Sequence, residues 1–551
     1  MSKNKMRIGI LSRDFNSLDN WELRIIQGIL DDPDLEISLI IKDGRKINSS
    51  KLEKIIKILK SKNFIAKSLF ELQRNIEKLL FRNRNILNVE SIIHELVKIN
   101  QIQLFPTRRG FLDIFDKEDA EKIKAHSLDI LLRFEFNIIR GDILNASKFG
   151  IWSFHHGDNS TFRGGPPAFW EIYSGQSIVG VTLQKLTSEL DGGFVIGKAY
   201  YNLHWSFVKT YLNIFEQSCE LLFKHIRLLK TTGDLVLNKS SVYYNRLYKI
   251  PPLNVTIRYC CRFYSKLFIK FLQGLDSSLF KRRYNCWTIF LGSGHFFETT
   301  LFRLKPCIVP KGKFWADPFL VQWKGEYYVF FEEYSYSDKK GKIAVGKVCG
   351  NEIVEVQIAI SKDYHLSFPN CFWDNGELFM IPESSEVERL EIYKCINFPY
   401  DWEVYSTAFL GEKIVDVVYY RDKNEDQWLF LNKGINNYFN SELYIYKIDS
   451  LRLNKITPHK KNPVIIDSRI GRNAGSIFVN EDKVYRPSQN NSNGTYGYGL
   501  NVNQILELNL DDYHERIIVS VNPNFKKGLI SSHHLHQLND CFVIDGAFKK
   551  C

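Results

Sequence analysis

Residues 153–191 read SFHHGDNSTFRGGPPAFWEIYSGQSIVGVTLQKLTSELD, and this stretch decides the fold of the first half of the chain. A buried strand is predicted to end just before His155, and residues 179–183 form a second strand that is followed by Asp191. The turn Arg163-Gly164 lies in the loop between the two strands. A lone histidine, or an aspartate in a turn, is more often structural than catalytic, so only the joint spacing of these residues indicates a site.

The chain before this stretch alternates strands and helices. Residues 7–11 and 35–41 are predicted strands, and residues 21–30 between them form a predicted helix. This β-α-β opening predicts a doubly wound α/β fold with a parallel sheet. Because it has no Gly-x-Gly-x-x-Gly loop, dinucleotide binding is not indicated. Residues 128–133 form another buried strand, and ligands of open α/β sheets bind at the carboxyl ends of such strands.

The stretch resembles the signature of the 10-formyltetrahydrofolate-dependent formyltransferases, which carry Asn-x-His-Pro-Ser, Arg-Gly-x-x-Pro, Gly-Val-Thr and Leu-Asp-x-Gly in this order. The matching positions are His155, Arg163-Gly164 with Pro166 or Pro167, Gly180-Val181-Thr182 and Leu190-Asp191-x-Gly193. The resemblance implies a formyltransferase-type domain over residues 1–245 and 10-formyltetrahydrofolate as the formyl donor. It implies catalytic roles for His155 and Asp191, and folate-binding roles for Phe134, Phe136, Arg163 and Gly164.

Formyl transfer requires a residue that moves protons. The attacking amine loses a proton, the folate nitrogen gains one, and the oxyanion formed between these steps needs hydrogen-bond donors. His155 suits the proton transfers because a histidine pKa ordinarily lies near neutral pH, and Asp191 would orient its ring.

Ser153 occupies the position where the family has asparagine, two residues before the histidine. Three alternatives stay open. The Ser153 hydroxyl polarises the formyl carbonyl from a shifted position, a neighbour among His156, Asp158 and Asn159 supplies the donor, or the site is weakened or repurposed. We favour an active transferase with Ser153 as the third catalytic residue.

The composition is that of a globular protein with more than one domain, since 551 residues exceed one ordinary core. The net charge is +12, but the basic residues are scattered and no nucleic-acid motif appears. We therefore expect a small-molecule or nucleotide-sugar substrate and no nucleic acid. The ten cysteines have no CxxC pair and no zinc-type spacing, so we expect no metal and a reducing, cytoplasmic location. No signal peptide or transmembrane segment is evident, and the oligomeric state stays open.

The second half of the chain changes to recurring short strands. Their starts lie about 50–58 residues apart, a spacing typical of propeller blades, and the runs are residues 327–331, 378–381, 428–431, 484–486 and 542–544. Most of them are followed by a second strand-like run. We therefore predict an all-β five-bladed propeller over residues 285–551.

Several motifs of this half resemble the N-terminal domain of plant glucosamine inositolphosphorylceramide transferases, which is itself similar to five-bladed glycoside hydrolases of the arabinanase type. They are residues 314–319 (FWADPF), 381–384 (IPES), 462–463 (NP), 474–475 (AG) and 485–489 (YRPSQ). Asp317 and Glu383 are candidate carboxylates for hydrolysis, which needs an acid and a base, and Glu332, Glu333 and Asp416 are further candidates. The other interpretation, which we favour, is that this domain binds sugar or only packs, without cleaving it.

Residues 246–284 are predicted to be a helical linker, rich in aromatic and basic residues. Residues 255–283 are either an amphipathic helix on an anionic membrane, which leaves peripheral membrane contact open, or a connecting helix whose apolar side packs between domains. We favour the connecting helix.

These observations predict a formyltransferase that moves a formyl group from 10-formyltetrahydrofolate to an amine. The sugar-type second domain favours the amine of a nucleotide-linked amino sugar, in surface polysaccharide biosynthesis. The alternative is a carbohydrate-active or glycan-binding propeller protein with a degenerate formyltransferase domain.

Overall fold

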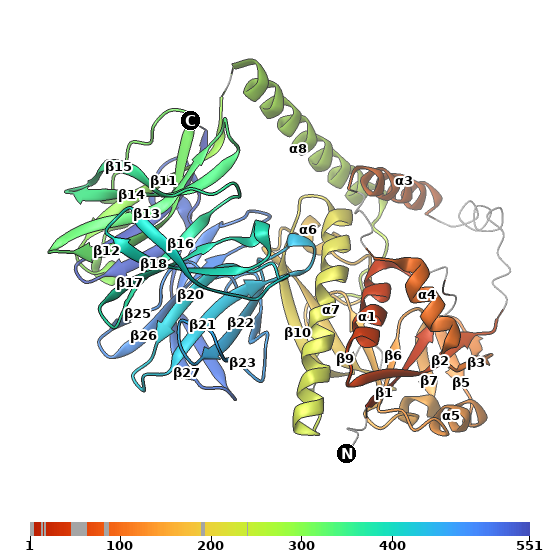
Figure 1. The fold of residues 1–551 in the computed structure, drawn as a ribbon. Coiled ribbons are helices and arrows are strands. Elements are labelled where there is room, and N and C mark those ends of the chain that lie inside the picture. The colour runs from red at the N-terminus through yellow and green to blue at the C-terminus, as the bar shows by residue number, and fades with distance from the viewer. Residues whose placement is uncertain are drawn as a thin grey trace. The chain divides into compact units, whose positions relative to one another are not determined.

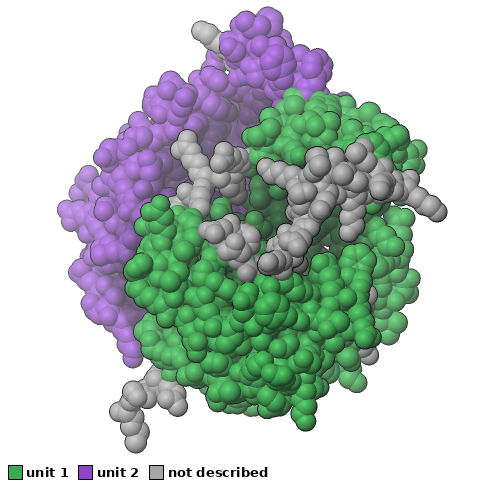
Figure 2. Space-filling model, turned by 90° about the vertical axis from the view of Figure 1, so that its right-hand side faces the viewer, with its two compact units in different colours: residues 1–199, 204–267 green, residues 200–203, 268–551 purple. Residues whose placement is uncertain are grey.

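The computed structural model describes residues 5–12, 15, 18–45, 63–81, 87–188, 193–239, 241–280 and 282–550. The chain, whose ribbon is drawn in Figure 1, divides into two compact units, which Figure 2 shows in different colours. Unit 1 comprises residues 1–199 and 204–267, and unit 2 comprises residues 200–203 and 268–551.

Unit 1 is built on a seven-stranded sheet, which confirms the predicted doubly wound α/β fold. In spatial order its strands are β10 (Phe194–Asn202), β9 (Ile178–Lys185), β8 (Ile151–His155), β6 (Ile130–Arg133), β1 (Met6–Ser12), β2 (Leu35–Asp43) and β3 (Gln101–Leu104). The strands from β8 to β3 pair in parallel, whereas β9 runs antiparallel to β8. The chain moves outward from β1 to β3 and then returns to β6 on the other side of β1. This reversal is the kind of switch point at which α/β sheets bind ligands.

The helices of unit 1 are α1 (Asn20–Asp31), α3 (Phe64–Leu80), α4 (Val89–Lys98), α5 (Lys117–Lys124), α6 (Phe169–Tyr173), α7 (Phe207–Thr232) and the first part of α8 (Leu253–Phe280). A capping box between Asp19 and Glu22 fixes the start of α1. Ser206 caps α7 by accepting a hydrogen bond from the Lys209 amide at 3.1 Å. α1 and α7 pack against each other.

A second, small sheet of unit 1 consists of β4 (Thr107–Arg109), β5 (Leu112–Phe115) and β7 (Ile138–Gly141). The sequence did not indicate it, because strands of three or four residues show too little alternation. Asp113 of β5 is fully buried and accepts hydrogen bonds from the Asn137 amide and side chain, at 2.9 Å and 3.0 Å. It also pairs with Arg45 at 2.6 Å. The small sheet therefore holds the loop that follows β6.

Unit 2 contains five antiparallel sheets within the described residues. They are β12 (Lys313–Trp323) to β15 (Glu352–Ile360), β16 (Ser367–Asp374) to β19 (Asp401–Ala408), β20 (Val415–Arg421) to β24 (Ile465–Ile466), β25 (Phe478–Asn480) to β28 (Tyr513–Val521), and β11 (Tyr284–Ser293) with β29 (Leu529–Ser531) to β31 (Cys541–Lys550). The intervening strands are β13 (Glu326–Ser335), β14 (Lys340–Cys349), β17 (Glu377–Glu383), β18 (Leu390–Asn397), β21 (Gln427–Lys433), β22 (Glu442–Ile448), β23 (Ile456–Pro458), β26 (Lys483–Asn490), β27 (Gly499–Leu508) and β30 (Leu535–Leu538). The pairing of β11 with β31 joins the first and last strands of the unit in one sheet.

Three successive sheets carry the same irregularity in their first strand. The pairing register shifts after Ala316 in β12, after Ser367 in β16 and after Val415 in β20. A residue other than glycine adopts a left-handed backbone at each of these bulges: Asp317 at φ 51°, Phe368 at φ 44° and Asp416 at φ 50°. Such conformations are sparsely populated and persist where the surrounding structure imposes them, often at functional sites.

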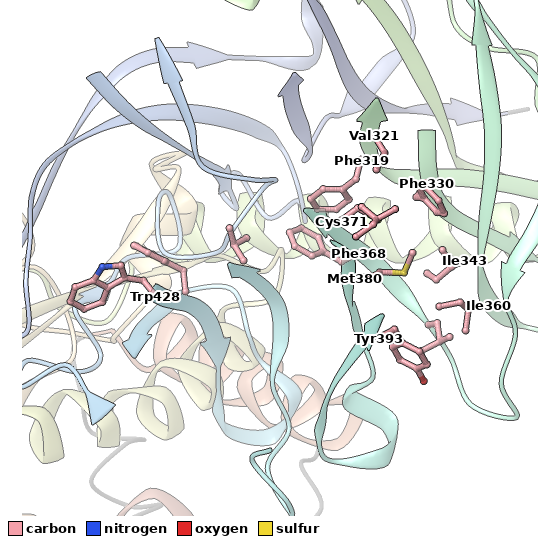
Figure 3. Close-up of a cluster of buried hydrophobic side chains, with 14 of the residues drawn as sticks. Phe319, Val321, Phe330, Ile343, Ile360, Phe368, Cys371, Met380, Tyr393 and Trp428 are labelled. Carbon is pink, nitrogen blue, oxygen red and sulfur yellow. The ribbon is translucent and has the colours of Figure 1, made fainter. Parts of the chain in front are cut away.

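A buried apolar cluster fills the space between the first three sheets of unit 2 (Figure 3). Phe319 and Phe330 come from the first sheet, Phe368 and Met380 from the second, and Trp428 from the third. These side chains are almost completely buried. Replacing one of the four aromatic residues with alanine should therefore cost about 3–5 kcal/mol of unfolding free energy.

The linker helix α8 is 28 residues long, as the helical prediction for this region implied. Thr256, Tyr259 and Phe263 are buried on one side of its first half. The apolar side chains from Phe268 to Phe280, which belong to unit 2, are largely exposed. The interpretation of α8 as a connecting helix whose apolar side packs between domains stays a prediction. Among the described residues, none of the helices has the length and apolar character that a membrane crossing requires.

Candidate functional site

His155 is the last residue of β8 and lies at the carboxyl edge of the unit 1 sheet. Its Nε2 atom is 2.7 Å from the Phe162 carbonyl oxygen. A carbonyl oxygen can only accept a hydrogen bond, so Nε2 carries the proton. In the neutral ring the other nitrogen, Nδ1, is then a proton acceptor. The loop after β8 therefore fixes the tautomer of this histidine.

Ser153 lies on the same face of β8 as His155, because residues two apart on a strand point the same way. Its side chain is buried, and its Oγ accepts a hydrogen bond from Arg133 Nε at 2.9 Å. The Arg133 guanidinium also donates to the Phe136 and Asn137 carbonyls, at 3.3 Å and 2.9 Å. Arg133 thereby links Ser153 to the loop that follows β6. Arg133 was not identified from the sequence, although a basic residue that ends an apolar strand is a usable signal.

The loop after His155 is held by the Gly-Val-Thr strand. Thr182 Oγ donates to the Gly157 carbonyl at 3.1 Å and accepts from the Asn159 amide at 3.3 Å. At Gly180 a Cβ atom would come within 2.8 Å of Asp158 Cβ, so this position requires glycine. The Gly-Val-Thr motif therefore has a local structural explanation in this chain.

Asp158 is fixed within the same loop. Burial raises its pKa, but Lys198 at 2.5 Å and two hydrogen bonds from Ser160 outweigh that effect, so the pKa of Asp158 is lowered overall. The carboxylate is therefore charged and paired near neutral pH.

The side chain of Arg163 closes this loop onto the segment after α7. Its Nε donates to the Asn159 carbonyl at 2.8 Å, and its guanidinium lies over the Tyr243 ring at 4.5 Å. Gly164 has φ 96°, and a Cβ there would come within 2.2 Å of the Tyr248 carbonyl oxygen. These two residues shape the backbone around the site. Their predicted role in folate binding stays a prediction.

The two phenylalanines after β6 have different surroundings. Phe134 is half-buried against Trp21, with ring centroids 5.5 Å apart. Phe136 is buried in the core and lies 5.6 Å from the Phe115 ring. Phe134 is therefore the better placed of the two to contact a ligand, whereas Phe136 stabilises the loop through its packing in the core.

His156 belongs to the aromatic core. Its ring stacks on Phe215 at 3.4 Å and 9°, and burial holds its pKa well below the ordinary value. It is a neutral packing residue next to His155.

Glu171 of α6 was not singled out from the sequence, although a carboxylate inside the apolar run AFWEIY is a signal. It is buried, and burial raises its pKa to about 7. It helps to line a small recess together with Gly157 and residues 162–167. A carboxyl group that titrates near neutral pH beside the loop of His155 is a candidate for proton transfer.

Asp191, the predicted partner of His155, lies outside the described residues. The structure brings together His155, Ser153, Arg163 and Gly164 on β8 and its following loop, with Phe134 on the adjoining loop after β6.

Unit 2 contains a second group of ionisable residues, which we call the carboxyl cluster. Five of them are buried and two are largely buried, and they are Asp317, Glu332, Asp416, His533 and Asp545, with Glu383 and Arg472. They come from at least four of the five sheets and their connections. Burial raises the pKa of Asp317 to about 7 and that of Glu383 to about 8, and burial holds the pKa of Glu332 well above its ordinary value. Some of these carboxyl groups are therefore protonated near neutral pH.

Asp545 organises one side of the cluster. It accepts hydrogen bonds from the His533 and His534 amides, at 2.9 Å and 3.0 Å, and its Oδ2 lies 2.6 Å from His533 Nδ1. His533 Nε2 then faces Asp317 Oδ1 at 3.9 Å. Asp317, His533 and Asp545 could hold a metal ion, since one ligand atom from each lies within 4.8 Å of the others. The Asp545 oxygens, however, already accept these hydrogen bonds.

Arg472 organises the other side. Its Nε is 2.5 Å from Asp416 Oδ2, and its guanidinium lies 4.0 Å from Glu383 and 5.1 Å from the Tyr496 ring centroid. Neither Arg472 nor the pair His533 and Asp545 was identified from the sequence. The usable signal was Asp545, a carboxylate inside the apolar strand FVIDGAF.

Glu332 and Glu333, adjacent on β13, point to opposite faces. Glu332 lies 3.4 Å from His365. Burial raises the pKa of its carboxyl, and the nearby charges of Asp317 and Glu383 raise that pKa further. Glu333 instead pairs with Lys313 at 2.6 Å and accepts from Trp315 Nε1 at 3.2 Å. Only Glu332 of these two belongs to the cluster.

Comparison with known proteins shows that the N-terminal and C-terminal regions of the chain resemble different classes of protein. Residues 308–539 match the family described as "Glucosamine inositolphosphorylceramide transferase 1, N-terminal". The N-terminal region is similar to formyltransferases, so the chain is a fusion of a formyltransferase-like region with a region of this second type.

The individual similarities cover parts of both chains. Glucosamine inositolphosphorylceramide transferase 1 of Arabidopsis thaliana is 34% identical over 208 residues, which are 37% of this chain and 27% of that protein. Methionyl-tRNA formyltransferase of Prochlorococcus marinus is 30% identical over 122 residues, 22% of this chain and 36% of that protein. The chain thus spans about a third or less of these curated relatives. A solved sugar N-formyltransferase of a Shewanella species aligns with 44% of this chain and 76% of its own, at 14% identity and a TM-score of 0.27.

Proposed function

We propose that unit 1 transfers a formyl group from 10-formyltetrahydrofolate to an amine, with His155 as general base and general acid. The observation that carries this proposal is the position of His155 at the carboxyl edge of the sheet, with Nε2 bonded to the Phe162 carbonyl. Nδ1 would take the proton of the attacking amine and return it to the folate nitrogen. The sequence similarity to methionyl-tRNA formyltransferase supports the reaction class.

Asp191 would orient His155 or relay its proton, as the family signature implies. Phe134, Arg163 and Gly164 would shape the folate pocket from the loops after β6 and β8. Glu171, with its pKa near 7, would be a further proton reservoir beside the loop.

The acceptor we propose is an amino sugar carried on a nucleotide, used in surface polysaccharide synthesis at a cytoplasmic location. The support is the fusion to a region similar to an inositolphosphorylceramide glucosamine transferase, whose name refers to a sugar substrate. Methionyl-tRNA is the competing acceptor, because the formyltransferase relatives act on it by name.

The test is single-turnover formyl transfer by the full chain, with 10-formyltetrahydrofolate and either UDP- and dTDP-linked amino sugars or initiator methionyl-tRNA. We expect transfer to a nucleotide-linked amino sugar, and a loss of about 10²–10⁴ in rate for His155→Ala. His94→Ala, an exposed histidine of α4, is the control. Undiminished transfer by His155→Ala would refute the assigned base, and transfer to the tRNA alone would refute the acceptor.

A second candidate function is carbohydrate binding or cleavage in unit 2. We infer that its five sheets are the blades of a propeller and that the carboxyl cluster faces a sugar ligand. The specific observation is that Asp317 and Glu383 have pKa values near 7 and 8, so that one carboxyl can donate a proton while another accepts one.

Binding and cleavage are separated by measuring calorimetric affinity for amino and neutral saccharides, and hydrolysis of aryl glycosides. We expect Asp317→Asn and Glu383→Gln to weaken binding at least tenfold. Glu333→Gln, on the opposite face of β13, should bind as the wild type does. Loss of hydrolysis in Asp317→Asn with full hydrolysis in His155→Ala would assign cleavage to unit 2. If all variants bound the saccharides equally well, the carboxyl cluster would not be a sugar-binding site.

A further inference from the structure

The first half of helix α8 is anchored by buried side chains. Thr256, Tyr259 and Phe263 recur at helical spacing and are buried, and the last two pack with Phe70 and Phe207 in an aromatic cluster of unit 1. The Tyr259 hydroxyl donates to buried Glu77 at 2.8 Å. The first half of the helix is therefore firmly attached, and it positions the rest of α8.

The rest of α8 exposes large apolar side chains in a continuous row. Ile257, Tyr264, Phe268, Leu272, Leu275 and Leu279 are three, four or seven residues apart, so they lie along one face. The six side chains are between 41% and 71% exposed, and Phe271 and Phe280 nearby are exposed to a similar degree. A contiguous apolar surface of this kind on a globular protein generally marks an interaction site.

The apolar surface continues onto α3 within unit 1. Leu69, Leu72 and Ile76 of α3 and Ile257 and Tyr264 of α8 line a shallow recess of about 520 Å³. Leu79 and Leu80, at the end of α3, are also exposed. The surface is thus wider than one helix face.

The charge of α8 indicates what covers this surface. Arg258, Arg262, Lys266 and Lys270 recur at every fourth residue and are all exposed. The one acidic residue of this fully described helix, Asp276, is bonded to Tyr284 and pairs with Arg282 and Lys550 at 3.0 Å each. The basic row starts beside the apolar row and turns away from it, because four residues advance by more than one turn. A helix is about as thick as a Debye length at physiological salt, so all four charges act on an anionic surface next to the helix.

We propose that α8, together with the adjoining face of α3, docks the protein on an anionic lipid surface. The helix lies in the membrane interface, with its apolar row among the acyl chains and Arg258 beside the headgroups. The other basic side chains lie farther around the helix and attract the anionic surface from a greater distance. A second copy of the chain is a poorer occupant, because pairing two α8 helices along this row brings together two helices that each carry a net positive charge. The proposal does not depend on formyl transfer.

The experiment is flotation of the full chain with vesicles of phosphatidylcholine alone or of phosphatidylcholine with phosphatidylglycerol at 3:1, at low and high salt. We expect binding to the anionic vesicles that weakens as salt rises. Phe268→Ser with Leu272→Ser should reduce the partition coefficient roughly tenfold or more. Arg258→Gln should reduce it roughly fivefold, because a basic residue near an anionic surface contributes about that factor. Lys266→Gln should reduce it by less, because Lys266 lies farther around the helix from the apolar row.

The matched controls are Leu410→Ser and Lys423→Gln, which change exposed residues outside α8. They should bind as the wild type does, and an unchanged thermal unfolding profile should show that the α8 variants are folded. Equal binding to neutral vesicles would refute the electrostatic part. Absence of binding to either vesicle would refute the proposal. A concentration-dependent dimer that Leu272→Ser abolishes, without lipid binding, would assign the surface to a second copy.

Discussion

Arg133 Nε donates a hydrogen bond to Ser153 Oγ across 2.9 Å, and this bond joins the end of β6 to the middle of β8. Ser153 is the residue at which the chain departs from the formyltransferase signature. The hydroxyl is buried and already bonded to Arg133, and it also lies 3.4 Å from the Phe154 carbonyl. Its surroundings are those of a residue that positions Arg133 and the loop after β6.

Ser153→Ala should therefore lower single-turnover formyl transfer by about tenfold. Removal of a direct oxyanion donor typically costs about 10²–10³. The structural reason for the smaller loss is that the variant removes an acceptor for Arg133 and no donor to the formyl oxygen. Ser153→Thr, which retains the hydroxyl, is the conservative control and should recover the rate. A loss beyond 10² with unchanged folate affinity would instead establish Ser153 as an oxyanion donor.

His156→Phe should make unit 1 less sensitive to acid. The pKa of His156 in the folded protein is held well below 6.5 by burial, so the unfolded chain binds more protons below pH 6.5. Wild-type stability therefore falls as the pH is lowered from 7 to 5, and phenylalanine removes that contribution while keeping the stack on Phe215. Thermal unfolding of both proteins at pH 5, 6 and 7 measures the difference. Parallel curves across this range would contradict a buried neutral His156.

Glu171→Gln should stabilise unit 1 at alkaline pH. Burial raises the folded pKa of Glu171 to about 7, above its unfolded value near 4.5. Its contribution to stability is fully present below pH 4.5 and is lost as the pH rises through 7. The loss is on the order of 3 kcal/mol of unfolding free energy, since each unit of pKa difference corresponds to about 1.4 kcal/mol. The variant should gain on the wild type between pH 5 and pH 8 in denaturant titrations. Glu118→Gln, an exposed change on α5, should show no such trend.

Asp545→Asn should lower the pKa of His533. Burial lowers that pKa, and the Asp545 carboxylate at 2.6 Å more than reverses the effect. Histidine resonances followed by NMR should show His533 titrating at a lower pH in the variant. Because Asp545 is fully buried, Asp317→Asn is the second variant, and it should shift His533 downward by a smaller amount. An unchanged His533 titration in both folded variants would contradict this geometry.

The regular elements of unit 1 followed from local sequence patterns. The apolar run before Arg133 and the run before His155 became β6 and β8, and the helix predicted over residues 21–30 became α1 (Asn20–Asp31). In unit 2 the recurring strand runs indicated a repeat, and the structure has an antiparallel sheet at each of them. These patterns were readable because burial of one face or one stripe leaves a periodic trace in the sequence.

The networks of polar side chains could not be predicted from the sequence in the same way. Arg133 and Ser153 are 20 residues apart, and Arg472 and Asp416 are 56 apart. Their contacts depend on how strands are placed side by side, and a side-chain hydrogen bond leaves no periodic trace. For α8, the amphipathic pattern predicts an apolar face without indicating what covers that face.

The repeated bulge of β12, β16 and β20 has a consequence for engineering. One backbone position, with a left-handed φ of 44–51°, carries a carboxylate at Asp317, an aromatic ring at Phe368 and a carboxylate again at Asp416. The same scaffold thus tolerates unlike side chains at equivalent places, while the apolar packing around them persists. Exchanging residues among these three positions therefore changes the side chain at a bulge without requiring a different backbone there.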